Sequence, residues 1–125
     1  MKIGDIYWFV SKGEIAHPHV IIAVDVETET LTLCGLTTNL KKKDFPGNVL
    51  LDKGEGGLDV VSIVEVSKTI AVKQGQLKSY IGSLNSNRVK QIQEGIGFIN
   101  RSFLRTTKQV PRLNFNRFLI GFHIE

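Results

Sequence analysis

The hydrophobic pattern of this chain changes its period once, near Asn85. Before that point, short runs of apolar, β-branched and aromatic residues alternate with polar or glycine-containing loops, which is typical of strands. The predicted strands are 5–10, 20–26, 30–36, 47–51, 58–66 and 69–72. After that point, apolar residues recur at steps of three and four residues, at Val89, Ile92, Ile96 and Ile99. This spacing predicts one amphipathic helix with Asn85 as its N-cap. Many short strands with one late helix favour a mainly β protein, a small β-barrel or curled sheet with short helices.

Length and composition exclude several classes of protein. The chain has 125 residues, of which 42% are hydrophobic and 22% charged, so we expect a folded domain with a core of its own. Its first residues lack the apolar segment of a signal peptide, and no apolar run is long enough to cross a bilayer. A single cysteine, Cys34, excludes an internal disulfide framework, and its alternating apolar surroundings predict a small buried side chain. These features predict a cytoplasmic protein without a membrane partner.

The charges are distributed unevenly along the chain. Residues 1–62 carry six basic and nine acidic side chains, whereas residues 63–125 carry ten basic and three acidic ones. A basic half favours an anionic partner, and RNA and DNA are the usual candidates. Lysines that serve only solubility would give the same imbalance, so the charge pattern alone leaves both interpretations open.

The end of the chain differs in composition from the rest. Residues 106–125 contain no acidic side chain before Glu125, and they interleave arginine and lysine with phenylalanine. This mixture suits single-stranded nucleic acid, but the aromatic and aliphatic side chains can equally be buried against the domain or a second copy. We therefore expect a barrel domain, 1–105, and a C-terminal extension, 106–125, that packs on the domain or the dimer and includes a last strand at 118–124.

Motifs for metals and common cofactors are missing from the sequence. His17 and His19 stand two residues apart, but no cysteine or third nearby histidine completes a zinc site. The chain has no G-x-G-x-x-G, no Walker-type G-K-[ST] and no G-x-S-x-G. We therefore predict no metal and no cofactor.

His17 and His19 flank Pro18 directly before an apolar run. In an extended segment, side chains two residues apart share one face, and histidine exchanges protons near neutral pH. The pair can therefore form a site. Alternatively, His19 is a partly buried histidine whose neutral ring cannot hold phosphate.

Several segments together resemble the PemK/MazF family of toxin endoribonucleases. They are G-D-I-Y-W-F, H-P-H-V-I-I-A-V, G-L-T-T-N, V-V-S-I-V-E-V-S-K-T-I and L-N-S-N, in the family's order from residue 4 to about 103. The resemblance implies a curled antiparallel barrel of the SH3-like type and a homodimer with an RNA groove between its subunits. It also implies a cognate antitoxin that occupies the groove, and metal-independent cleavage of single-stranded RNA with the 2′-hydroxyl as internal nucleophile.

Two family positions fall on residues that can do chemistry. The family's usual arginine before a proline falls on His17, and its threonine or serine after the third strand falls on Thr37. Arginine stays charged and binds phosphate through two hydrogen bonds, whereas histidine readily transfers protons. We therefore predict His17, Thr37 and His19 as catalytic residues, with both histidines at one phosphate. Alternatively, the change from arginine marks the loss of the enzyme on a retained fold.

The neighbours of these positions suit RNA binding. Two polar residues follow Thr37, three lysines come next in the loop that borders the family's groove, and a lysine stands where a later arginine is common. The predicted RNA-binding residues are Thr38, Asn39, Lys41, Lys42, Lys43 and Lys68. Lysines bind phosphate without reading sequence, although a merely solvated loop would look the same. Glu65 matches an acidic position of the family.

Two other functions fit a fold of this kind. A non-enzymatic module would use the basic half of the chain to bind RNA, DNA or a protein partner. A third possibility is a poison of DNA gyrase, since a toxin family of similar fold acts on that enzyme, but no residue in this sequence points to it. Residue 17, where the family's arginine is absent, is the feature that separates the enzyme from the module.

Overall fold

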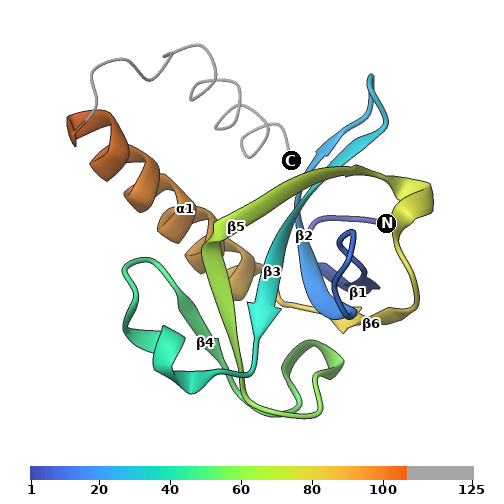
Figure 1. The fold of residues 1–125 in the computed structure, drawn as a ribbon, viewed down its shortest axis with the longest axis horizontal. Coiled ribbons are helices and arrows are strands. Elements are labelled where there is room, and N and C mark those ends of the chain that lie inside the picture. Colours follow the sequence, from blue (N-terminus) through green and yellow to red (C-terminus); the bar gives the residue numbers. More distant parts are fainter. Residues whose placement is uncertain (107–125) are drawn as a thin grey trace.

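The computed structural model describes residues 1–106 of the chain. In this range the chain forms six strands, three short 3₁₀ helices and one α-helix (Figure 1). The strands are β1 (Asp5–Phe9), β2 (His17–Asp25), β3 (Thr30–Thr37), β4 (Val49–Leu51), β5 (Ser62–Lys73) and β6 (Tyr80–Ser83). The helices are η1 (Leu40–Asp44), η2 (Glu55–Gly57), η3 (Gln74–Gln76) and α1 (Ser86–Thr106). The predicted mainly β fold with one late helix is confirmed.

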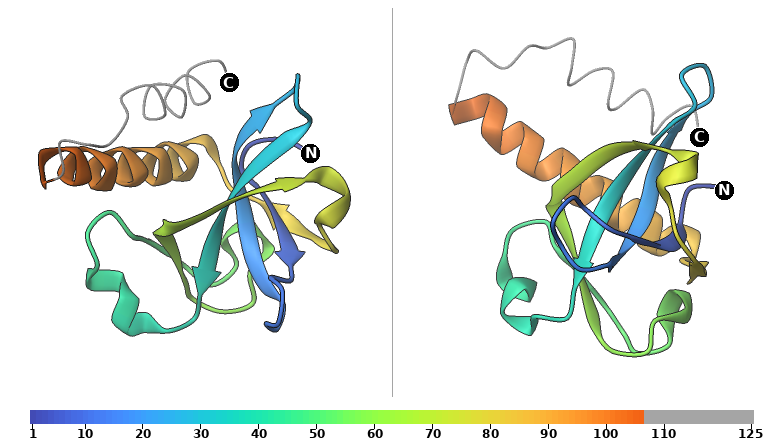
Figure 2. Two further views of the ribbon diagram at one scale, coloured as in Figure 1. Left: turned by 45° about the horizontal axis from the view of Figure 1, so that its top comes forward. Right: turned by 45° about the vertical axis from the view of Figure 1, so that its right-hand side comes forward.

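The strands form one antiparallel sheet in the order β4-β5-β3-β2-β1-β6. The sheet curls into a half-barrel, and β2 and β3 continue beyond it as a projecting hairpin (Figure 2). η2, which follows the edge strand β4, packs against the other edge strand, β6. A Cβ on Gly82 would lie 2.2 Å from the carbonyl oxygen of Gly56, so this close backbone contact requires glycine. The curled antiparallel barrel predicted above is therefore the observed architecture.

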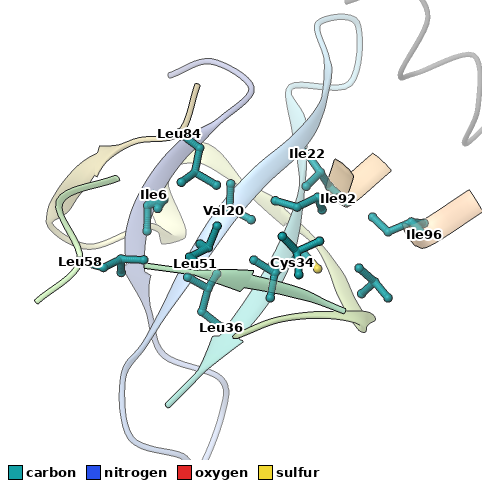
Figure 3. Close-up of a cluster of buried hydrophobic side chains, with 13 residues drawn as sticks. Ile6, Val20, Ile22, Cys34, Leu36, Leu51, Leu58, Leu84, Ile92 and Ile96 are labelled. Carbon is teal, nitrogen blue, oxygen red and sulfur yellow. The ribbon is translucent and has the colours of Figure 1, made fainter. Parts of the chain in front are cut away.

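The core occupies both faces of β2. Val20 and Ile22 belong to the larger apolar cluster, whereas Ile21, between them, belongs to a smaller one. Ile92 and Ile96 point from α1 into the larger cluster (Figure 3) and are almost fully buried. Burial of each such side chain contributes about 1.5–3 kcal/mol. The helix thus covers the face of the sheet that carries the larger cluster, and the smaller cluster lies on the opposite face.

The start of α1 is fixed by two interactions. Asn85 caps the helix, since its Oδ1 accepts the backbone N–H of Arg88 at 2.9 Å, which confirms the predicted N-cap. The guanidinium of Arg88 donates to both carboxylate oxygens of Glu55, at 2.8 and 2.7 Å, and so ties the helix to η2. Within residues 1–106, no helix combines the length and the apolar character needed to cross a membrane.

β2 begins earlier than the sequence pattern indicated. The predicted strand was 20–26, but the observed one starts at His17. Pro18 pairs only with Trp8 of β1, because the pairing with β3 starts one residue later, at His19 opposite Gly35. The missing N–H of the proline therefore breaks no ladder on the β3 side. As a result, both histidines are strand residues with defined directions.

The predicted strands 58–66 and 69–72 are a single strand, β5. Its middle part, from Ser67 to Ala71, is exposed, and the polar pair Ser67 and Lys68 hides the continuity of the strand in the sequence. β6 was not predicted, since it is a four-residue edge strand with little apolar pattern. The predicted last strand, 118–124, and the extension after Thr106 lie outside the described residues.

Candidate active site

A pocket of about 430 Å³ opens where β1, β2, β3 and β5 lie next to one another. Strand residues form most of its wall, and the loop between β1 and β2 adds the rest. The lining side chains that can take part in chemistry are Glu14, His17, His19, Thr37, Glu65 and Lys68. The structure thus brings together all three predicted catalytic residues and one predicted RNA-binding residue, Lys68.

Strand geometry explains why the two histidines and Thr37 meet. Side chains alternate along β2, so His17 and His19 point to the face that carries the smaller core cluster with Ile21. His19 lies opposite Gly35 of β3, where that ladder begins, and Thr37, two residues further along β3, lines the same pocket as His17. Strand pairing therefore positions all three residues, because His17 pairs with Phe9 of β1, His19 with Gly35 of β3 and Thr37 with Ile63 of β5.

Gly35 leaves room for the ring of His19. A Cβ at this position would lie 3.5 Å from Nε2 of His19 and 3.8 Å from the Cβ of Lys68. Because Gly35 has no side chain, the space in front of Nε2 stays part of the pocket. Gly35 is needed for access to the ring and not for a left-handed turn, so its role is not visible in the sequence.

Two contacts hold the half-buried imidazole of His19. Its ring meets Phe9 edge-on, with centroids 5.1 Å apart, and its Nδ1 lies 2.9 Å from the carbonyl oxygen of His17. Burial lowers the pKa of His19 below its ordinary value, and the neighbouring His17 acts in the same direction. The hydrogen bond to His17 and the carboxylate of Glu14 raise the pKa of His19 but do not reverse the shift. His19 is therefore mainly neutral at pH 7.

An ion pair forms the wall of the pocket on β5. The carboxylate of Glu65 is only about one tenth exposed, and the ammonium nitrogen of Lys68 lies 3.3 Å from its Oε2. Lys68 itself is largely exposed, so its ammonium group is in contact with solvent as well as with Glu65. It contributes a positive charge to the lining of the pocket. Glu65, which matched an acidic position of the family in sequence, is thus the ion-pair partner of Lys68.

Cys34 lies beside the pocket but is not one of its reactive groups. Its thiol donates a hydrogen bond to the backbone oxygen of Glu65 at 3.0 Å. Burial raises the pKa of Cys34 to about 12, so the thiol stays protonated at neutral pH. The prediction of a small buried side chain is confirmed.

The other predicted RNA-binding residues follow Thr37 and lie outside the lining of the pocket. Oγ1 of Thr37 accepts the N–H of Asn39 at 3.2 Å, and Oδ1 of Asn39 accepts the N–H of Lys41 at 3.1 Å. These bonds start η1, on which Lys42 lies over the ring of Phe45. Since Thr37 is the acceptor in its bond, its hydroxyl proton remains available to a substrate.

Sequence reasoning missed two lining residues that come from the loop between β1 and β2. Glu14 and Ser11 reach the pocket because this loop closes back over the start of β2. Glu14 is exposed and sits in a polar, glycine-containing segment, so no pattern in the sequence distinguishes it from a solvated loop residue. Only the fold places its charge near His19.

The comparisons with known proteins agree with this architecture. Residues 2–99 match the family described as the PemK-like, MazF-like toxin of type II toxin–antitoxin systems. The match spans more than half of the chain, and the chain therefore belongs to this family. A search of curated proteins found no match.

Solved structures show which folds are similar. An endoribonuclease in complex with its cognate antitoxin, from a mycobacterial species, has a TM-score of 0.66 at 16% identity, covering 78% of this chain and 92% of that one. The Mycobacterium tuberculosis toxin MazF-mt6 has a TM-score of 0.62 at 23% identity, covering 74% and 92%. A further mycobacterial endoribonuclease has a TM-score of 0.61 at 16% identity, covering 76% and 86%. At these identities the likeness establishes the fold.

Proposed function

We propose that this chain is the toxin of a type II toxin–antitoxin pair and that it cleaves single-stranded RNA without a metal ion. The observation that carries the proposal is the convergence of His17, His19 and Thr37 in one pocket of a protein of this family. The 2′-hydroxyl of the RNA attacks the adjacent phosphorus and expels the 5′-oxygen of the next nucleotide. The products are a 2′,3′-cyclic phosphate and a 5′-hydroxyl.

The pocket contains the kinds of group that this reaction needs. The reaction needs an acceptor for the 2′-hydroxyl proton, a donor for the leaving oxygen, and stabilisation of the charge on the phosphate oxygens. His17 and His19 can exchange protons near neutral pH. The hydroxyl of Thr37 and the ammonium of Lys68 can donate to the phosphate oxygens.

The same proposal includes the partners. The protein forms a homodimer in the cytoplasm, RNA binds in the groove between the subunits, and a segment of the cognate antitoxin occupies that groove. The structure of a similar endoribonuclease with its cognate antitoxin supports an antitoxin partner.

The direct test is cleavage of mixed single-stranded RNA by the purified full-length protein in excess EDTA. We expect fragments with 2′,3′-cyclic phosphate ends, no cleavage of DNA of the same sequence, which lacks the 2′-hydroxyl, and growth arrest when the protein is expressed in bacteria. RNA that stays intact with EDTA and with added divalent metals would contradict the proposal. Tight, salt-dependent RNA binding in that case would favour the non-enzymatic module.

The lysines of η1 give a second prediction. Replacing Lys41 and Lys43 together by alanine should weaken RNA binding and reduce the slope of log affinity against log salt by about 1.4, at about 0.7 per phosphate contact. The turnover of bound RNA should stay unchanged, because neither lysine lines the pocket. Filter binding at several salt concentrations measures the slope.

The matched control removes two exposed lysines elsewhere, Lys53 before η2 and Lys90 on α1. The control variant loses the same net charge, so a difference between the two variants reports the position of the lysines and not the total charge. An equal loss of affinity in the control would mean that η1 is only a solvated helix.

A further inference from the structure

We propose that His19 is the general base of this site and that it takes the proton of the RNA 2′-hydroxyl on its Nε2 atom. The assignment rests on the RNA cleavage proposed above and adds the atom that accepts the proton. It starts from the bond between Nδ1 of His19 and the carbonyl oxygen of His17. A carbonyl oxygen can only accept, so Nδ1 must carry the proton. A neutral imidazole has one N–H, which leaves the lone pair of Nε2 unprotonated.

Nε2 of His19 also faces the pocket. It lies 3.5 Å from the place that a Cβ on Gly35 would take, and both residues line the pocket. The edge-to-face contact with Phe9, at an interplanar angle of 74°, holds the ring from another side. The ring is thus fixed both in its tautomer and in its direction, as a positioned base requires.

The charges around His19 favour a base over a phosphate ligand. Four titratable or charged side chains line the pocket together with His19: Glu14 from the β1–β2 loop, His17 from the same strand, and Glu65 and Lys68 from β5. β1 and β3 add no charged side chain to the pocket, since their lining residues are Phe9, Gly35, Leu36 and Thr37. Burial lowers the pKa of His19, so the ring is mainly unprotonated at pH 7 and can accept a proton. The same neutrality makes it a poor ligand for phosphate.

His17 acts as the general acid, so the reaction takes up one proton at His19 and releases one proton from His17. The proton of the 2′-hydroxyl passes to Nε2 of His19 while the 2′-oxygen forms a bond to phosphorus. The bond from phosphorus to the 5′-oxygen breaks, and protonated His17, the more exposed imidazole, gives its proton to the leaving oxygen. Water then exchanges protons with both rings and restores the starting states.

The tautomer can be measured directly in the wild-type protein. We expect ¹⁵N spectra of the imidazoles at neutral pH to show His19 protonated on Nδ1 and unprotonated on Nε2, with the pKa of His19 below 6.5 in the titration. A ring protonated on Nε2 would overturn the assignment. This readout does not depend on whether the protein is active.

The kinetic test uses His19→Gln, which keeps a polar side chain but cannot take up a proton. We expect kcat to fall by about 100-fold or more with little change in KM. In the wild type, kcat/KM should fall as the pH drops through the pKa of His19, because the protonated ring has no lone pair on Nε2. In the variant that dependence should disappear. Lys90→Ala, on an exposed part of α1, is the control for handling and yield.

Gly35→Ala tests the same idea with both histidines in place. The new methyl group would stand in van der Waals contact with Nε2 and cover it, so we expect a loss of about tenfold or more in kcat. Cleavage that survives both substitutions with its pH dependence intact would overturn the role of His19 alone. If the wild type cleaves no RNA, the proposed function itself fails, and the role of His19 fails with it.

Discussion

Replacement of His17 by alanine is expected to lower kcat for RNA cleavage by about two to four orders of magnitude, the usual contribution of a positioned acid or base. His17 is exposed at the start of β2, so its side chain adds no core packing and the fold should stay intact. Single-turnover cleavage in EDTA measures the loss, and circular dichroism checks the fold. Undiminished cleavage would remove His17 from the mechanism.

His17→Arg is the matched variant, since it restores the residue that the family usually carries at this position. Arginine keeps a positive charge for the phosphate, so KM should stay close to the wild-type value. It gives up a proton far less readily than histidine near neutral pH, so kcat should remain well below that of the wild type. Higher activity in the arginine variant would instead identify the natural chain as a weakened member of its family.

The fold was predictable where burial imposes a simple pattern. The early strands follow from alternation, and α1 follows from its apolar spacing and Asn85. β5 was predicted as two strands because its exposed middle part, around Lys68, interrupts the apolar run where the strand borders the pocket. Pro18 hid the start of β2, since a proline normally argues against a strand. In both places, the residues that obscured the strand lie in or next to the candidate site.

Only those site residues could be predicted that follow from the resemblance to the family or from their spacing along a strand. His17 and Thr37 came from the resemblance, and the shared face of His17 and His19 from their spacing. The approach of Glu14 depends on how the β1–β2 loop closes, which no local pattern fixes. The tautomer of His19 depends on one backbone carbonyl, and its open Nε2 depends on a missing side chain at Gly35. Contacts of this kind exist only in three dimensions.

The largest effect on stability is expected from Gly95→Ala in the middle of α1. A Cβ there would lie 2.1 Å from the carbonyl oxygen of Gly47, which is backbone and cannot move aside as a side chain can. Helix and loop must separate, and overpacking of this kind typically costs about 1–3 kcal/mol, more than the roughly 1 kcal/mol that alanine gains over glycine in a helix. We therefore expect the free energy of unfolding to fall, as measured by urea denaturation with an unchanged m-value.

Gly97→Ala, two residues further along α1, is the control that separates packing from helix propensity. A Cβ at Gly97 would meet only the end of the flexible Arg101 side chain, at 3.4 Å. Alanine should therefore stabilise the protein here, by about 0.4–1 kcal/mol. Opposite signs at the two glycines would show that Gly95 is there for the backbone of Gly47. Asn48, next to Gly47, accepts the N–H of Val66 and so joins the same loop to β5. If both substitutions instead stabilise the protein, helix and loop do not approach this closely, and α1 does not anchor the loop that carries η1.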